Sequence, residues 1–197
     1  MNKYIQIADE LAKQNIFTNH GGPFGAVIVK DGVIVGAGNN HVVVNNDATA
    51  HAEVTAIRDA CKRLNTFDLS GCELYTNCYP CPMCLSAIIW SNIKTVYYGN
   101  TKEDAEDIGF RDDMIYRYID TLKAGGDESI LKVIPLDRDE TIKTFQEFKN
   151  KTEYFLKLKV SCFFYIKRES KTFYRLSPYY QYSHIKQLNY YHYIKKV

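Results

Sequence analysis

Two short stretches decide the fold and the chemistry predicted for this chain of 197 residues: Thr49-Ala50-His51-Ala52-Glu53 and Tyr79-Pro80-Cys81-Pro82-Met83-Cys84. Together they supply one imidazole, one carboxylate and two thiols. Zinc prefers thiolate and imidazole ligands, and a catalytic zinc site keeps one of its four tetrahedral positions for water. His51, Cys81 and Cys84 therefore predict a metal site with three protein ligands and one open position.

Glu53 follows His51 by two residues, so the two side chains cannot share one face of a helix. We expect the Glu53 carboxylate beside the metal, where it takes a proton from the water and returns it to a leaving group. A structural zinc or a redox-active C-x-x-C is the alternative interpretation. A structural zinc usually has four protein ligands, and outside residues 78–84 the chain offers no C-x-x-C and no close histidine pair to supply the fourth.

The first motif is expected to open a helix. Apolar residues recur at helical spacing just beyond Thr49, which indicates a helix that starts near this residue. Thr49 can act as its cap. These residues are Val54, Ile57, Ala60 and Leu64. His51 and Glu53 would then lie in the first turn.

The second motif, at 79–84, is also expected to open a helix. Pro82 suits the first turn of a helix, where its missing N–H costs nothing. The helix continues through 85–90 as a nearly all-apolar run, so we expect it to be deeply buried. Its positive end would lower the pKa of the Cys81 and Cys84 thiols and favour metal-bound thiolates.

Strands and helices alternate along the rest of the chain, which indicates an α/β sandwich. The residue pattern predicts helices at 3–14, 112–122 and 141–149, and strands at 24–29, 33–38, 73–76 and 95–98. A polar loop at 39–47 leads into the His51 helix. The apolar residues of the later helices are expected to face inward; they are Met114, Ile115, Tyr118, Ile119, Leu122, Ile142, Phe145 and Phe148.

Length and composition indicate one domain with an appendage. No stretch of about 20 apolar residues is present, which argues against a membrane span. The segment Met1 to Glu10 carries charge where a signal peptide needs an apolar run, so we expect a cytoplasmic protein. Four cysteines outside the metal site, Cys61, Cys72, Cys78 and Cys162, have no framework spacing and are interpreted as reduced thiols.

Charge divides the chain in two. Residues 155–197 hold nine Lys or Arg and one acid, whereas residues 1–154 hold 16 basic and 22 acidic residues. The acidic body is poorly suited to a polyanion. The tail, with eight Tyr, is either a basic aromatic arm for nucleic acid or an adventitious extension that is only solvated. We interpret 155–197 as lying outside the catalytic fold.

H-x-E followed by P-C-x-x-C is the signature of zinc-dependent base deaminases. Residues 1–154 resemble bacterial guanine deaminase, in the cytidine deaminase-like superfamily. The stretches that carry the resemblance are 21–32, 46–58, 81–85, 109–113 and 145–154. The first three are shared in part with tRNA adenosine deaminases and yeast-type cytosine deaminase, and the last two point to guanine deaminase.

The resemblance implies a three-layer α/β/α sandwich with a mixed five-stranded sheet. It implies hydrolysis of guanine to xanthine and ammonia with one zinc ion per subunit. It also implies a homodimer that exchanges its C-terminal segments, so that each pocket is completed by the neighbouring subunit. Nucleic acid is not an expected partner.

Four further site residues follow from the resemblance. Asn40 would hold the base by hydrogen bonds, and Phe24 would stack on it. Asp112 would contact the purine near its amine and help to carry protons, and Tyr154 would reach into the partner's pocket. Asn40 and Asp112 also suit capping roles, and Phe24 also suits a core position.

The chain departs from the family at Tyr79, where we expect Glu, and in the 43 residues that follow Tyr154. Deamination of cytosine, or of adenosine in tRNA, is the nearest rival function. A nucleic-acid-binding protein with a structural zinc is the rival from another class.

Overall fold

The computed structural model describes residues 1–150. Met1–Asp127 forms one compact unit, and the described residues 128–150 belong to a second unit. The C-terminal extension at 155–197, together with Tyr154 and Cys162, lies outside the described residues. In the described part of the chain, no helix combines the length and the apolar character that crossing a membrane requires.

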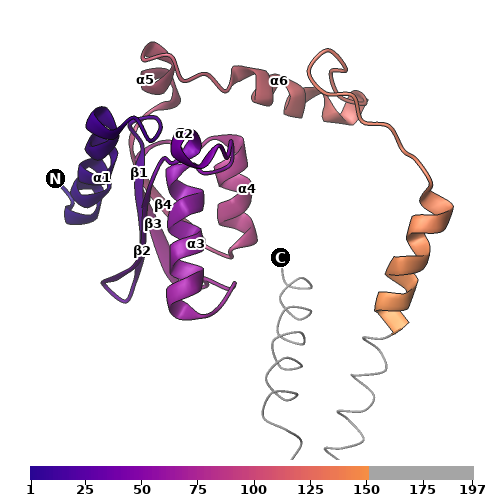
Figure 1. The fold of residues 1–197 in the computed structure, drawn as a ribbon, viewed down its shortest axis with the longest axis horizontal. Helices are drawn as coiled ribbons and strands as arrows, with labels where there is room; N and C mark the ends of the chain where they lie inside the picture. Colours follow the sequence, from indigo (N-terminus) through magenta and orange to yellow (C-terminus); the bar gives the residue numbers. More distant parts are fainter. Residues whose placement is uncertain (151–197) are drawn as a thin grey trace, which may run out of the picture. The chain divides into compact units, whose positions relative to one another are not determined.

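A mixed four-stranded sheet forms the centre of the first unit (Figure 1). The spatial order is β2-β1-β3-β4, with β1 antiparallel to both of its neighbours and β3 parallel to β4. The strands are β1 (Gly25–Lys30), β2 (Val33–Asn39), β3 (Cys72–Cys78) and β4 (Thr95–Asn100). The predicted strands are confirmed within one or two residues at each end.

The prediction of a fifth strand is wrong for residues 1–150. After β4 the chain continues into helices, and no described residue pairs with the outer edge of β4. Residues 131–136 have the apolar, β-branched character of a strand but no strand structure. Leu131, Val133, Ile134 and Leu136 are exposed. A strand needs a neighbouring backbone to pair with, and this segment has none among the described residues.

Helices cover both faces of the sheet, which confirms the three-layer sandwich. On one face, α1 (Lys3–Thr18) packs Tyr4 and Leu11 against Val27 and Val29 of β1. On the other face lie α3 (Ala52–Leu64) and α4 (Pro82–Trp90) (Figure 1). That second core contains Ala26, Ile28 and Leu74 from the strands and Ala56, Ala60 and Ile88 from the helices. Neighbouring residues of β1 thus alternate between the two cores, as the pleat of a strand requires.

The helix α3 lies close to β2 because both elements present small residues. A Cβ atom added at Gly38 would lie 2.7 Å from the backbone nitrogen of Ala56. A Cβ atom at Gly36 would lie 2.5 Å from the Ala56 carbonyl oxygen. This close approach places the first turn of α3, which carries the metal motif, over the ends of the central strands.

Two predictions of burial are wrong. In α4, Pro82, Cys84 and Ile88 are buried, but Ile89 and Trp90 are exposed. The helix α6 (Asp113–Thr121) has a strongly apolar side, yet Met114, Ile115, Ile119 and Leu122 are exposed. Phe145, within the helical stretch 138–150, is exposed as well. An apolar stripe on a helix predicts that this side packs against another part of the protein. No described residue packs over these exposed apolar side chains.

The remaining elements are short. The polar loop predicted at 39–47 contains one turn of helix, α2 (Val42–Asn45), and the region after β4 contains α5 (Lys102–Asp107). The short 3-10 helix η1 (Leu122–Ala124) follows α6. Gly125 and Gly126 end it with φ angles of 105° and 84°, which a residue with a Cβ rarely adopts.

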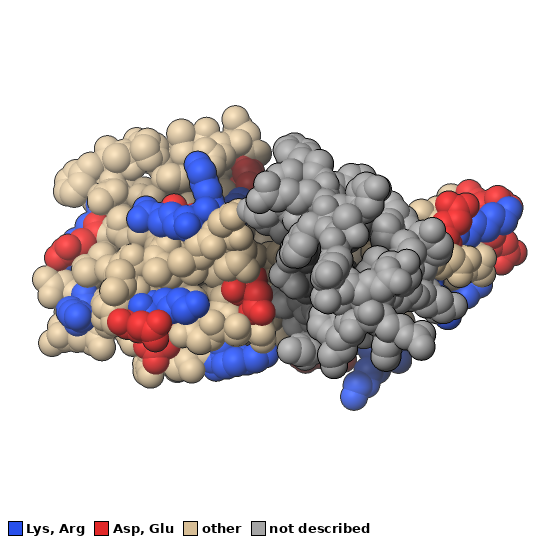
Figure 2. All heavy atoms as spheres, turned by 90° about the horizontal axis from the view of Figure 1, so that it is seen from below, with Lys and Arg blue, Asp and Glu red and all other residues tan. Residues whose placement is uncertain are grey.

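Charged side chains are mixed over the visible face of the molecule (Figure 2). Lysine and arginine side chains lie beside aspartate and glutamate side chains, and neither sign gathers into a broad region on the described part of that face. On this face, the described residues do not provide the concentrated positive field that binds nucleic acid.

Candidate metal centre and active site

Both metal motifs begin a helix in the same way. His51 is the N-cap of α3 with φ −65° and ψ 160°, and Cys81 is the N-cap of α4 with φ −64° and ψ 167°. Pro82 occupies the first turn of α4, as predicted. Two positive helix ends therefore converge on the same place, where they favour negatively charged ligands.

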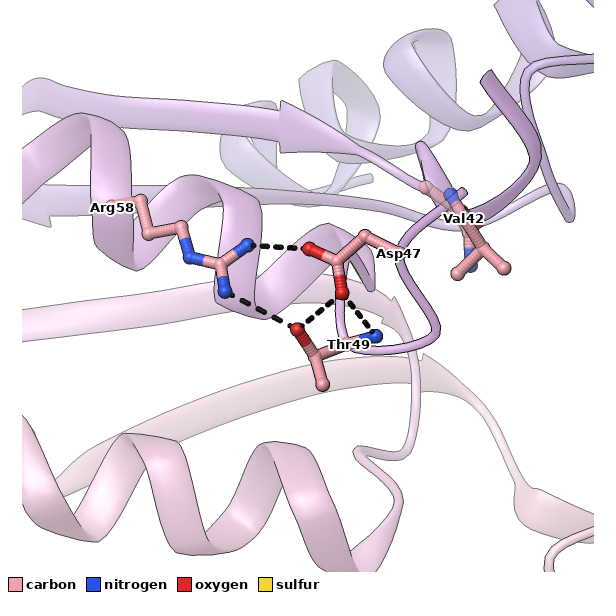
Figure 3. A network of polar contacts seen from close by, with 5 residues as sticks. Val42, Asp47, Thr49 and Arg58 are labelled. Carbon is pink, nitrogen blue, oxygen red and sulfur yellow. Dashed lines mark hydrogen bonds and ion pairs between the residues drawn. The ribbon is translucent and has the colours of Figure 1, made fainter. Parts of the chain in front are cut away.

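The prediction that Thr49 caps α3 is wrong, because Thr49 has other partners. Its backbone N–H and its hydroxyl group both donate to Asp47, at 2.8 and 2.6 Å, and Arg58 donates to the Thr49 hydroxyl at 3.2 Å. Arg58 also pairs with Asp47 at 3.3 Å (Figure 3). This network holds the loop before the helix, and the cap position passes to His51, whose side chain faces the thiols instead.

The three predicted zinc ligands meet at distances that suit one ion. His51 Nδ1 lies 3.6 Å from the Sγ atom of Cys81 and 3.6 Å from that of Cys84. All three donor atoms lie within 4.8 Å of one another. Zn–N bonds of about 2.05 Å and Zn–S bonds of about 2.3 Å at a tetrahedral angle place nitrogen and sulfur about 3.6 Å apart. The donor set and its spacing therefore fit a tetrahedral zinc.

Cys78 does not supply a fourth ligand, although it stands three residues before Cys81. Its Sγ atom lies 3.5 Å from the carbonyl oxygen of Thr101, and it is absent from the ligand group found among the described residues. Burial raises the pKa of the Cys78 thiol to about 11, which keeps it protonated. The arrangement favours a three-ligand site over a closed structural site.

The local electrostatics suit metal-bound thiolates. A hydrogen bond from Cys84, assisted by His51, lowers the pKa of the Cys81 thiol to about 4. The same hydrogen bond and burial raise the pKa of Cys84. The hydrogen bond with Cys81 raises the pKa of His51. The three side chains thus stabilise a negative sulfur, the form that binds a metal ion.

Glu53 lies next to this group without belonging to it. One carboxylate oxygen, Oε2, accepts from the Cys84 thiol at 3.4 Å, and Oε1 is 3.5 Å from the hydroxyl of Thr76. The side chain is 6% exposed, and burial raises the pKa of its carboxyl group. A carboxylate with a raised pKa is a stronger proton acceptor.

One cavity of about 310 Å³ brings the predicted residues together. It is lined by His51, Glu53, Cys81, Phe24, Asn40 and Asp112. Cys84 is fully buried behind its wall. The volume is near the lower end of the range for small-molecule sites, about 300–1,000 Å³, and favours a small ligand.

Asn40 presents a hydrogen-bond donor to the cavity. Its Oδ1 accepts from the backbone N–H of Val42 at 3.1 Å, so its Nδ2 carries the free hydrogens. The side chain is buried, and its Nδ2 has no hydrogen-bond partner among residues 1–150. A Cβ atom at Gly21 would overlap Asn40 Oδ1, so glycine leaves the room that the amide needs. Buried donors normally have acceptors, so this amide is a candidate for binding a group in the cavity.

Phe24 and Asp112 complete the cavity wall. Phe24 packs partly against the core and meets the ring of Phe110 edge-on, with centroids 4.9 Å apart. It therefore serves both the core and the cavity. Asp112 is the N-cap residue of α6 but makes no capping hydrogen bond within the described residues. Burial and then the charge of Cys81 raise the pKa of Asp112.

Sequence reasoning missed one residue that supports the site from behind the cavity wall. Asn77 is buried in β3, where its side chain accepts from the Gly25 N–H at 3.0 Å and donates to the Pro23 carbonyl at 3.0 Å. It holds the loop that carries Phe24, and a polar residue between the apolar positions of a strand was the available signal. Tyr79 lines the cavity and packs edge-on against Tyr98, with centroids 5.0 Å apart.

Comparison with known proteins agrees with this geometry. Residues 1–100 match the family described as the cytidine and deoxycytidylate deaminase zinc-binding region. The chain belongs to this family of zinc-dependent deaminases. The guanine deaminase of Bacillus subtilis is 46% identical to it over 154 residues, which cover 77% of this chain and 97% of the relative.

Solved structures show the same relationship for this deaminase. The X-ray structure of guanine deaminase from Bacillus subtilis is 45% identical, with a TM-score of 0.70, over 76% of this chain and 95% of that chain. A guanine deaminase from Nitrosomonas europaea is 37% identical, with a TM-score of 0.52, over 54% of this chain and 62% of that chain. The tRNA-specific adenosine deaminase of Aquifex aeolicus is 50% identical over 76 residues, only half of that relative.

Proposed function

We propose that this deaminase hydrolyses guanine to xanthine and ammonia. The observation that carries the proposal is the shared cavity. It is lined by two of the three zinc ligands and by the buried carboxylate of Glu53, and also by an amide whose donors have no partner among residues 1–150. The similarity to guanine deaminase extends over nearly the whole length of the Bacillus subtilis relative, which supports guanine as the substrate.

The proposed chemistry assigns the proton transfers to Glu53. When bound, zinc supplies the polarisation that lowers the pKa of a water molecule from about 16 toward about 7. Glu53 accepts a proton from this water as its oxygen bonds to carbon 2 of guanine. The carboxyl group then gives the proton to a ring nitrogen of guanine. Glu53 next takes the remaining proton from the hydroxyl group now on carbon 2 and passes it to the amine. The carbon–nitrogen bond breaks, ammonia leaves, and the oxygen remains on carbon 2.

The proposed base contacts come from other residues that line the cavity. The Nδ2 group of Asn40 can donate to a carbonyl oxygen or ring nitrogen of guanine, which would satisfy a buried donor. Phe24 provides a flat apolar surface for the ring. Asp112 is assigned to the amine end, where its raised pKa suits it to exchange a proton with the departing group.

We also propose that the protein acts as a homodimer in which the C-terminal segments are exchanged. Several described surfaces support a second copy as the missing partner: the open edge of β4, the exposed Ile89 and Trp90 of α4, and the apolar side of α6. Four apolar residues within 131–136 are exposed, as in a segment that pairs with another chain. Tyr154 is proposed to enter the partner's pocket. A cytoplasmic location and a catalytic domain that ends at residue 154 also remain predictions.

Two rival substrates share the same chemistry, namely cytosine and adenosine in tRNA. The similarity to tRNA-specific adenosine deaminase supports the second. The net negative charge of residues 1–154 and the mixed charges in Figure 2 argue against a polyanion such as tRNA as the substrate.

Ammonia release separates the three substrates. Equal amounts of zinc-loaded protein should be given guanine, cytosine or an adenosine-containing anticodon stem-loop, and the ammonia released from each should be measured. We expect release from guanine alone, and faster turnover of either rival would replace the proposal.

A further inference from the structure

Asn15 is a buried polar residue in the last turns of α1, on the face of the sheet opposite the metal motifs. It is 4% exposed, and it does not line the cavity. An asparagine has poor helix propensity, and burial of its amide costs free energy unless all its polar atoms are bonded. Its contacts therefore show what the side chain does.

The Asn15 amide joins two backbone carbonyls that belong to the cavity wall. Its Nδ2 donates to the carbonyl oxygen of Gly22 at 2.8 Å and to that of Asn40 at 2.7 Å. Its Oδ1 accepts from Asn39 Nδ2 at 2.9 Å. Both hydrogens and the oxygen are thus used, which leaves one orientation for the side chain.

The two carbonyls flank the residues proposed to hold the base. The N–H of Phe24 donates to the Gly22 carbonyl at 2.8 Å, and the N–H of Asn40 donates to the Phe24 carbonyl at 3.0 Å. Backbone hydrogen bonds therefore link Gly22 to Phe24 and Phe24 to Asn40, and the Asn15 amide connects the two ends of this chain of hydrogen bonds. The closed network sets the separation between the phenyl group of Phe24 and the amide of Asn40 from behind the cavity.

We propose that Asn15 is a positioning residue for the base: it fixes Phe24 and Asn40 at the spacing that guanine requires, without touching guanine. This inference rests on the proposed function. Removal of the Asn15 donors leaves the Gly22 and Asn40 carbonyls without this hydrogen-bond partner. The loop that carries Gly22 and Phe24 can then move independently of the end of β2. Misplacement by about 1 Å, caused by a mutation far from the reacting atoms, can cost about a hundredfold in efficiency. Because Phe24 and Asn40 are proposed to bind the base and not to carry protons, we expect this loss to appear in KM.

Two variants separate hydrogen-bond donation from packing. N15D keeps the shape and the oxygen that Asn39 donates to, but replaces the NH₂ donor with an acceptor. N15A removes the amide altogether. The matched control is S91A, which removes another buried hydrogen bond, from the Ser91 hydroxyl to the Ile88 carbonyl at 2.9 Å, away from the cavity.

The measurements are KM and kcat for guanine, the inhibition constant of the product xanthine, zinc content, and the unfolding midpoint. We expect N15D and N15A to raise KM and the xanthine inhibition constant by about tenfold or more, to change kcat by less than about threefold, and to keep one zinc per chain. S91A should lower the unfolding midpoint with KM unchanged. If a variant does not fold, N15S retains one hydroxyl donor and should show a smaller rise in KM.

The outcomes distinguish the inference from the proposed function. No turnover of guanine by the unsubstituted protein contradicts the proposed function. Turnover by that protein, with KM and the xanthine constant of N15D and N15A within twofold of its values, overturns the positioning role of Asn15. A lowered unfolding midpoint without a change in either constant would show that Asn15 only stabilises the fold, and would overturn it too.

Discussion

The Sγ atom of Cys84 lies 3.4 Å from the Oε2 atom of Glu53. One residue belongs to α4 and the other to α3, so this contact joins the first turns of the two helices that carry the motifs. It places a zinc ligand in contact with the carboxylate that is proposed to move protons. The two proposed roles predict different effects of mutation: loss of the metal for Cys84 and loss of the rate for Glu53.

The substitution E53Q tests the carboxylate. The amide keeps the shape of the side chain but cannot accept a proton, so we expect zinc to remain and the rate of guanine deamination to fall by about 10²–10⁴-fold. Elemental analysis and an ammonia assay measure the two quantities. The control is E73Q, the same change at Glu73, whose carboxylate accepts from the Tyr75 hydroxyl at 2.8 Å outside the cavity. A rate above about a tenth of normal in E53Q would contradict the proton-transfer role.

Removal of a thiol ligand should remove the metal. We expect C81A and C84A to retain less than one tenth of the normal zinc after dialysis, because two protein ligands hold zinc far more weakly than three. C72A changes another buried cysteine, outside the metal group, and should keep its zinc. Elemental analysis of all three variants at equal concentration is the measurement. Normal zinc content in C81A or C84A would show that the ion binds elsewhere.

Asn40 is expected to act through its donor. N40D keeps the oxygen that Val42 donates to but replaces the free NH₂ group with an acceptor. We expect KM for guanine to rise by about tenfold to a hundredfold, the cost of an unmade hydrogen bond in a buried site. N45D makes the same change at an exposed position of α2 and should leave KM unchanged. Equal KM values for N40D and the unsubstituted protein would rule out a base contact by Nδ2.

The activity should fall in acid at a pH set by Glu53. Burial raises the pKa of Glu53 above its ordinary value of 4.5, so the protonated form persists to a higher pH than in an exposed glutamate. Catalysis requires the ionised form, and kcat/KM should therefore decline tenfold per pH unit below an apparent pKa that lies above 4.5. Zinc content must be measured at each pH. A constant kcat/KM down to pH 4.5 with zinc retained would exclude Glu53 as the base.

The C-terminal extension is expected to be dispensable. If 155–197 lies outside the catalytic fold, a chain that ends at Tyr154 should keep kcat/KM for guanine within about threefold of the full-length value, whereas Y154A should lose more than about tenfold.

Light scattering should give twice the chain mass of 22.8 kDa for the full-length protein, the mass expected of a dimer. A monomer with full activity would contradict the exchanged dimer, and loss of activity in the shortened chain would assign the extension a role.

Much of the site could be predicted because few chemistries need these residue types at these spacings. Two motifs predicted that His51, Cys81 and Cys84 share one site and that Glu53 lies beside it, and the geometry agrees. Each motif opens a helix, and the contact between Cys84 and Glu53 joins the first turns of these two helices. Thr49 was misjudged as the cap because a threonine before a helix has that propensity. The sequence alone did not show that Asp47 and Arg58 would occupy its polar atoms.

The errors of burial have a different physical cause. Periodicity shows that Met114 and Ile119 form an apolar side of α6, but not which surface covers it. The same holds for Trp90 on α4 and for the segment 131–136. Asn15 could not be predicted as a site residue either, because its role depends on carbonyl groups of distant loops that no sequence pattern encodes.

The central claim is that one zinc ion, held by His51, Cys81 and Cys84, enables this chain to deaminate guanine. The most direct measurement is to remove the metal with a chelator, return zinc in steps, and follow xanthine formation from guanine. We predict that activity is lost on removal and rises linearly until one zinc is bound per chain, with no further increase. Xanthine formation without zinc, or none at full zinc occupancy, would contradict it.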